Sequence, residues 1–185
     1  MKRTLFIWLT LVIVCVFCIN TSFAQEKIHW IKVTDIEAAM AKKPKKVLID
    51  VYTNWCGPCK MMMNQTFTDP EVIKHINENY YAVKFNAEGN ESFTFKGQNY
   101  VNKSFNPNNV NRRNGTHDFT MAIAPVNGRV AYPTVVYMDE SLQIIAPVQG
   151  FWKTPEFLPL IHFISEEIYK TDTSFDQYKI TYNSK

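Results

Sequence analysis

The fold is decided by the stretch VLIDVYTNWCGPCK, residues 47–60. Residues 47–52 form an apolar, β-rich run bounded by polar segments, which predicts a buried central strand interrupted by one carboxylate, Asp50. Cys56 and Cys59 follow, three positions apart, and we expect a helix from this pair to about Phe67. The sequence therefore predicts a Cys-x-x-Cys at the junction between a buried strand and a helix.

That junction suits redox chemistry. Free N–H groups and the dipole at a helix start favour an anion, so the pKa of Cys56 should fall and its thiolate should be the nucleophile. Cys59 lies one turn further on, close enough to attack a mixed disulfide and release the product. Pro58 lacks the N–H that a helix start leaves unpaired. We predict Cys56 as the attacking thiol and Cys59 as the resolving thiol.

Metal binding is the main competing interpretation of the pair. A zinc site would need a second Cys pair or a downstream His-x₃₋₅-His, and haem attachment would need His where Lys60 stands. Copper(I) stays open because Met61, Met62 and Met63 follow directly. At consecutive helical positions these thioethers point in different directions, so at least one should be core filler or a surface contact. An inert structural disulfide is the third alternative, and we predict no metal site and no cofactor.

The N-terminus has the pattern of a secretory signal peptide. A basic start precedes the apolar run from Leu5 to Ile19, and the small residues Ser22 and Ala24 stand where a cleavage site needs them. We expect residues 1–24 to be removed and the protein to be exported to the periplasm or cell envelope. The apolar run is short for a spanning helix of about 20 residues, but an uncleaved anchor is the alternative.

Cleavage would change the composition of the chain. Of 185 residues, 161 would remain, enough for one domain, with 18 basic and 17 acidic residues and a net charge of +1. This balance excludes an electrostatic case for binding nucleic acid. Two of the four cysteines would be lost, and the remaining pair closes too short a loop to constrain the unfolded chain much. The pair is therefore chemical rather than structural.

The other elements follow from capping, turn and periodicity signals. They alternate along one chain without repeats and predict an α/β domain, a mixed central sheet flanked by helices on both faces with an antiparallel pair at its end. The expected elements are a helix opened by a capping box at Thr34–Glu37 and ending before Pro44, a helix opened by Asp69 and Pro70, a strand over 80–86, a hairpin over 92–101, a loop over 106–115, a short helix over 117–124, strands over 134–138 and 142–148, and a final helix opened at Thr154 or Pro159.

Two charged residues are candidates for the site. A carboxylate in an apolar strand is unfavourable without a role, so Asp50 could lie behind Cys59 and accept its proton, with burial raising its pKa. Lys84, in the strand over 80–86, is a candidate partner. The alternatives are a solvated aspartate at an edge and an exposed strand lysine.

The motif WCGPCK and the strand before it resemble the active-site strand and helix of the thioredoxin superfamily. Tyr132-Pro133-Thr134 is similar to its cis-proline segment, which implies a cis Pro133 facing the cysteines. The resemblance also implies catalytic roles for Asp50 and Lys84 beside Cys56 and Cys59. The substrate-binding residues that it implies are Trp55, Gly57, Pro58, Tyr132, Pro133 and Gly150.

Residues 67–72 are similar to exported thioredoxin-like proteins and to the C-terminal domain of the periplasmic disulfide reductase. We expect a thioredoxin-like domain over 25–170 and a tail over 171–185 that the pattern leaves unassigned. Lys84 and Pro133 are 49 residues apart, so an insertion over 87–116 precedes the cis-proline. It is either a wall of the site or a surface loop, and its aromatic residues would form a docking surface if exposed and a small core if buried.

The Gly-Pro dipeptide resembles reducing members of the superfamily. The resemblance implies an enzyme, a monomer, that reduces protein disulfides and is itself reduced by a membrane or periplasmic thiol donor. A disulfide oxidant or isomerase and a thiol reductase for cytochrome-c maturation are alternatives with the same chemistry. A binding protein or copper chaperone is the alternative from another class.

Overall fold

The computed structural model describes residues 26–183. The predicted signal peptide, with Cys15 and Cys18, lies outside this range. Within it, no helix is both long enough and apolar enough to cross a membrane.

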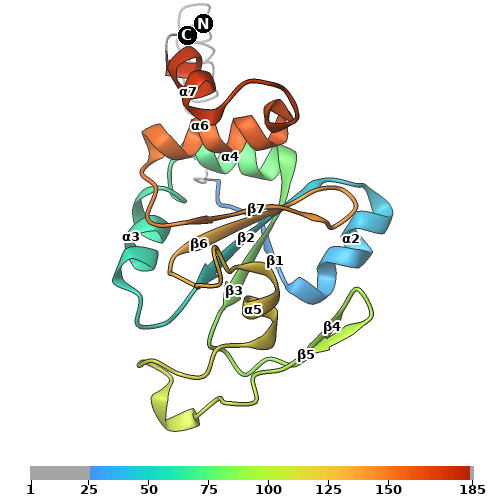
Figure 1. The fold of residues 1–185 in the computed structure, drawn as a ribbon, viewed down its shortest axis with the longest axis vertical. Helices are drawn as coiled ribbons and strands as arrows, with labels where there is room; N and C mark the ends of the chain where they lie inside the picture. The colour runs from blue at the N-terminus through green and yellow to red at the C-terminus, as the bar shows by residue number, and fades with distance from the viewer. Residues whose placement is uncertain (1–25, 184–185) are drawn as a thin grey trace, which may run out of the picture.

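A mixed five-stranded sheet forms the centre of the fold (Figure 1). The strand order is β1-β3-β2-β6-β7. Strands β1, β3 and β2 are parallel to one another, β6 is antiparallel to β2, and β7 is antiparallel to β6. This arrangement confirms the predicted mixed sheet. The two-residue edge strand β1 was not predicted because two residues carry no alternation. The strands are β1 (Trp30–Ile31), β2 (Lys46–Tyr52), β3 (Tyr80–Asn86), β6 (Thr134–Met138) and β7 (Ile144–Gln149).

Helices cover both faces of the sheet, as the fold class requires (Figure 1). The two apolar cores are separated by the alternation of β2: Leu48 faces the core with α3, α4 and α6, whereas Val47 and Ile49 face the core with α2 and α5. By the same alternation Asp50 points to the α3 face. The helices are α2 (Ile36–Lys42), α3 (Gly57–Gln65), α4 (Pro70–Asn79), α5 (Asp118–Ile123) and α6 (Thr154–Ser165).

The helix starts follow the predicted signals with one exception. Asp69 caps α4 by accepting hydrogen bonds from Glu71 N and Val72 N, as expected. The capping box at Thr34 is wrong, because the 3₁₀ turn η1 (Val33–Asp35) takes Thr34 into helical geometry and no side chain caps α2. α6 begins at Thr154, and Pro159 lies inside it.

The strand β7 forms the second edge of the sheet. It begins at Ile144, two residues later than expected, because Leu142 has a φ of 58° in the preceding turn. Pro147 stands in the middle of the strand, opposite Val136 of β6. Proline has no N–H to donate and is tolerated in a sheet at such an edge.

The insertion contains the expected hairpin, β4 (Phe93–Phe95) and β5 (Gln98–Tyr100). Its two-residue turn, Lys96–Gly97, has φ angles of 51° and 73°, a conformation that suits a tight hairpin. Phe95 and Tyr100 are buried, and with Phe93 they pack around Phe119 of α5. The aromatic residues of the hairpin therefore form a small core. A single 3₁₀ turn, η2 (Pro107–Asn109), lies in the predicted loop.

The tail contains helix α7 (Phe175–Asn183), which follows the 3₁₀ turn η3 (Ile168–Lys170). Helix α7 lies against α6 (Figure 1). Phe175 packs edge-on against Trp152 and Phe163, and Tyr178 packs against Phe163. The contacts of Phe175 and Tyr178 with Phe163 hold α7 on α6, a pattern too sparse for the sequence to indicate.

Candidate active site

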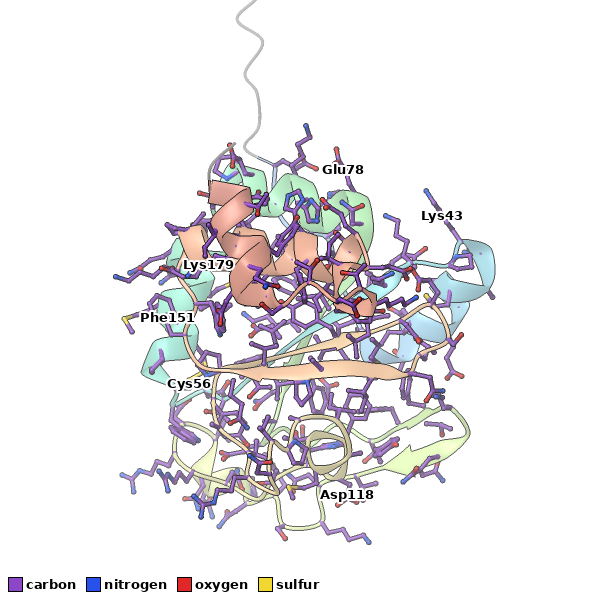
Figure 2. All side chains as sticks on the ribbon, turned by 45° about the horizontal axis from the view of Figure 1, so that its top comes forward. Lys43, Cys56, Glu78, Asp118, Phe151 and Lys179 are labelled. Carbon is purple, nitrogen blue, oxygen red and sulfur yellow. A yellow bond between two sulfur atoms is a disulfide. The ribbon has the colours of Figure 1, made fainter. Side chains whose placement is uncertain are left out.

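The two cysteines form a disulfide at the start of α3, at the end of the sheet where Figure 2 labels Cys56. Their Cα atoms are 5.3 Å apart, and the two residues are only 2% and 6% exposed. Cys56 occupies the N-cap position, and its Sγ accepts a hydrogen bond of 3.1 Å from Cys59 N. In the reduced protein the same amide and the helix N-terminus would stabilise a thiolate on Cys56.

Asp50 lines the same cavity as Cys59, with a volume of about 520 Å³. By the alternation of β2, Asp50 lies on the face of the sheet that α3 covers. Burial raises the pKa of Asp50 to about 7, and the positive charge of Lys84 offsets part of this effect. A carboxyl group with this pKa can accept and release a proton near neutral pH. Thr53, whose buried Oγ1 has no hydrogen-bond partner within the described residues, lines the same cavity.

Lys84 lies opposite Asp50 in the parallel pairing of β2 and β3. Its ammonium group is above the ring of Tyr52, 4.8 Å from the ring centre, and the ion pairs of residues 26–183 do not include one with Asp50. Lys84 is exposed and lines the same cavity as Asp50, and its positive charge acts on the pKa of Asp50.

The peptide bond between Tyr132 and Pro133 is cis, as expected. Pro133 O accepts a hydrogen bond of 2.8 Å from Gly150 N, so these two predicted binding residues lie together. Gly150 has a φ of 103°, which favours glycine. The Tyr132 ring packs edge-on against Trp55 at 5.9 Å. Gly57 and Pro58 are exposed in front of the disulfide.

The three methionines after the pair separate as the helix dictates. Met62 is fully buried in the core, Met61 is 44% exposed, and Met63 lies between these extremes. One of the three is therefore core filler. Within residues 26–183, no three His, Cys, Asp or Glu side chains are grouped so that they could hold a metal ion.

Sequence reasoning missed a second set of residues around Trp55. Glu88 is 9% exposed, and its Oε2 accepts hydrogen bonds from Trp55 Nε1 at 2.7 Å and from Asn114 N at 2.8 Å. The guanidinium of Arg113 lies over the Trp55 ring, 5.3 Å from its centre. A signal existed for Glu88: β2 and β3 are parallel and end at the same edge, so a carboxylate just after β3 lies near the residues just after β2. No pattern indicated Arg113.

A family model described as a thioredoxin-like domain matches residues 33–165. The chain belongs to this family. The matched range contains the cysteine pair, Asp50 and the cis-proline. The chain therefore has a thioredoxin-like fold that carries a redox pair, Cys56 and Cys59.

Among curated proteins, the thioredoxin-like chain is similar to "Thiol:disulfide interchange protein DsbD" of Pectobacterium atrosepticum, with 40% identity over 45 residues. The aligned segment is 24% of this chain and only 8% of that protein. The similarity is therefore local and covers less than a tenth of the relative.

Among solved structures, a thioredoxin-fold protein from Helicobacter pylori aligns with a TM-score of 0.54 and 17% identity over 76% of this chain and 81% of that chain. A structure titled "DsbH Oxidoreductase" aligns with a TM-score of 0.52 and 11% identity over 80% of this chain and 90% of that chain. At these identities the similarity supports the thioredoxin-like fold alone.

Proposed function

We propose that this protein is an exported thiol:disulfide oxidoreductase that reduces disulfides of other proteins. The observation that carries the proposal is the buried Cys56–Cys59 pair at the start of α3, with Cys59 N directed at Cys56 Sγ at 3.1 Å. The local similarity to a thiol:disulfide interchange protein supports the same chemistry.

The cycle starts from the reduced protein. The Cys56 thiolate attacks one sulfur of a substrate disulfide, forms a mixed disulfide and releases the first substrate thiolate. Cys59 then attacks Cys56 Sγ, the mixed disulfide breaks, and the second substrate thiolate leaves. Two electrons pass to the substrate, and the Cys56–Cys59 disulfide forms.

Asp50 has the proton role in this cycle. Asp50 and Cys59 line one cavity, so the Asp50 carboxylate can accept the Cys59 proton when the mixed disulfide is resolved. The raised pKa of Asp50, about 7, allows the carboxylate to take that proton and then release it to solvent. Lys84 lines the same cavity, and its positive charge offsets part of the rise in the pKa of Asp50.

The remaining site residues bind the substrate polypeptide. Backbone at Tyr132 and Pro133, supported by Gly150, receives the segment that carries the substrate cysteine, while Trp55, Gly57 and Pro58 bound it on the α3 side. A membrane or periplasmic thiol donor regenerates the dithiol, and the protein acts as a monomeric domain over residues 25–170 after loss of residues 1–24. The Gly-Pro dipeptide favours reduction as the direction.

Insulin reduction tests the chemistry. With dithiothreitol as electron donor, the purified protein should precipitate insulin B chain, and Cys56→Ser should abolish this activity. Cys59→Ser should instead accumulate mixed disulfides that non-reducing electrophoresis detects. Full activity of Cys56→Ser would contradict the mechanism.

The reduction potential tests the direction. Equilibration with glutathione should give a value near that of thioredoxin, roughly −270 mV. A value nearer roughly −120 mV would make the protein a disulfide donor instead.

A further inference from the structure

The insertion is anchored at the active site. Asn54 Nδ2 donates a hydrogen bond of 3.0 Å to Val110 O, and Glu88 joins the Trp55 indole to the backbone of Asn114. Both contacts join the segment just before Cys56 to residues 33 to 59 positions later in the chain. Of the two interpretations of the insertion, these contacts favour a wall of the site.

The residues of the second contact, Trp55, Glu88 and Asn114, line a pocket of about 440 Å³, which we call the insertion pocket. One side consists of Trp55 and of residues 130–132, which precede the cis-proline. The other side belongs to the insertion over 87–116 and includes Glu88, Arg113 and Asn114. Because Tyr132 precedes the cis-proline, the pocket opens next to the place where a substrate polypeptide passes. Its occupant would be a side chain close to the substrate cysteine.

Of the two charged side chains in the insertion pocket, Glu88 and Arg113, only Arg113 is exposed and free to bind a ligand. Glu88 is buried, and its Oε2 already accepts two hydrogen bonds. Arg113 is exposed, and none of the ion pairs found in residues 26–183 includes it. Its guanidinium rests on the Trp55 ring, which orients the group without neutralising it. The pocket therefore offers a positioned cation with free hydrogen-bond donors.

Resting on the proposed function, we propose that the insertion pocket selects protein disulfides with an acidic side chain next to the reacting cysteine, and that Arg113 is the residue that recognises it. A guanidinium matches a carboxylate with two parallel hydrogen bonds, and its orientation on Trp55 lowers the entropy lost on binding. Arg113 contacts substrate and not the reacting sulfur atoms, so it determines specificity.

Matched peptides test this assignment. Each carries one intramolecular disulfide, and members of a pair differ only by Glu or Gln beside one cysteine, on its N-terminal or C-terminal side. For at least one position, kcat/KM of the purified protein should be about three- to tenfold higher for the Glu peptide. In Arg113→Gln, the ratio of the two kcat/KM values should fall towards one.

Arg112→Gln is the matched control. It removes the same charge from the neighbouring exposed residue, which neither lines the insertion pocket nor lies on Trp55, so the Glu/Gln ratio should stay at the wild-type value. Equal kcat/KM for Glu and Gln peptides in the wild type, or an equal loss of preference in both variants, would overturn the assignment. Failure to reduce any peptide or insulin would instead refute the proposed function.

Discussion

Asp50 is the residue at which stability and chemistry oppose each other. The residue is 3% exposed in a strand of apolar residues, and burial raises the pKa of its carboxyl group from 3.8 to about 7. Above neutral pH the folded protein therefore holds an unfavourable charge, and the proton transfer that we propose at Cys59 would use that same group. The sequence indicated this conflict, since Asp50 interrupts an otherwise apolar run.

Asp50→Asn should make the protein more stable and less active. The pKa shift corresponds to roughly 2–4 kcal/mol at pH 8, and the gain in unfolding free energy should shrink towards pH 4, where Asp50 is protonated in the folded state. Urea titrations at both pH values measure the gain, and the lifetime of mixed disulfides measures the slower resolution.

Exposed Asp172 offers a comparison for this variant. Asp172→Asn should change stability by less than about 0.5 kcal/mol at either pH. A pH-independent effect of Asp50→Asn would contradict the role of its buried charge.

Elements with several local signals were the ones that the sequence predicted well. The strand β3 and the start of α4 follow from an apolar run and an Asp-Pro cap, and both have the expected bounds. β1 and α7 could not be predicted, because their existence depends on packing against β3 and α6 and not on local pattern. The conformation at Thr34 was also not predictable from local pattern: the sequence indicated a helix cap, but Thr34 lies inside a 3₁₀ turn.

The cap of α4 provides a prediction at this scale. Asp69→Ala should lower the unfolding free energy by about 1 kcal/mol, because the Asp69 carboxylate accepts hydrogen bonds from two N–H groups that have no other partner in the helix. Asp35→Ala is the natural control: Asp35 occupies the N-cap position of α2 without a capping hydrogen bond. Thermal unfolding of both variants should rank Asp69→Ala as clearly the less stable.

Between pH 4.5 and 6.5, His75 and Asp50 have opposite effects on the stability of the whole molecule. His75 lies half-buried with its ring centre 3.6 Å from that of His162, and burial together with His162 lowers its pKa to about 4. Between pH 4 and 6.5 the unfolded chain binds a proton at His75 that the folded protein lacks, so stability rises with pH. At Asp50 the folded protein keeps the extra proton, so stability falls with pH over the same range.

In His75→Gln, the pH dependence of the unfolding free energy should therefore reflect Asp50 without the opposing contribution of His75. The unfolding free energy of this variant should decrease from pH 4.5 to 6.5, whereas that of Asp50→Asn should increase by about 1–2 kcal/mol after allowance for solvent screening at His75. The lowered pKa values of Glu166 and Glu167 act below pH 4.5 and leave this range clear. Denaturant titrations across the range check both slopes, and His29→Gln, at an exposed histidine, should follow the wild type.

At the scale of the molecule, the sequence predicted which cysteines react but not what surrounds them. The motif and its strand carry the chemistry locally. The contacts of Glu88 and Asn114 with Trp55 arise from chain segments whose proximity depends on the parallel order of β2 and β3. The residues that we propose to select the substrate were the hardest to predict from the sequence, because the insertion that supplies them has no repeating pattern.

Pro147 has a consequence for behaviour at high concentration. An unpaired strand edge can join the edge of another molecule and start a growing aggregate. Here β7 exposes such an edge, but Pro147 in its middle has no N–H group to donate. At the opposite edge of the sheet, β1 is only two residues long. Neither edge offers a long run of free hydrogen-bonding groups, so the sheet resists intermolecular growth even where the chain is crowded by copies of itself.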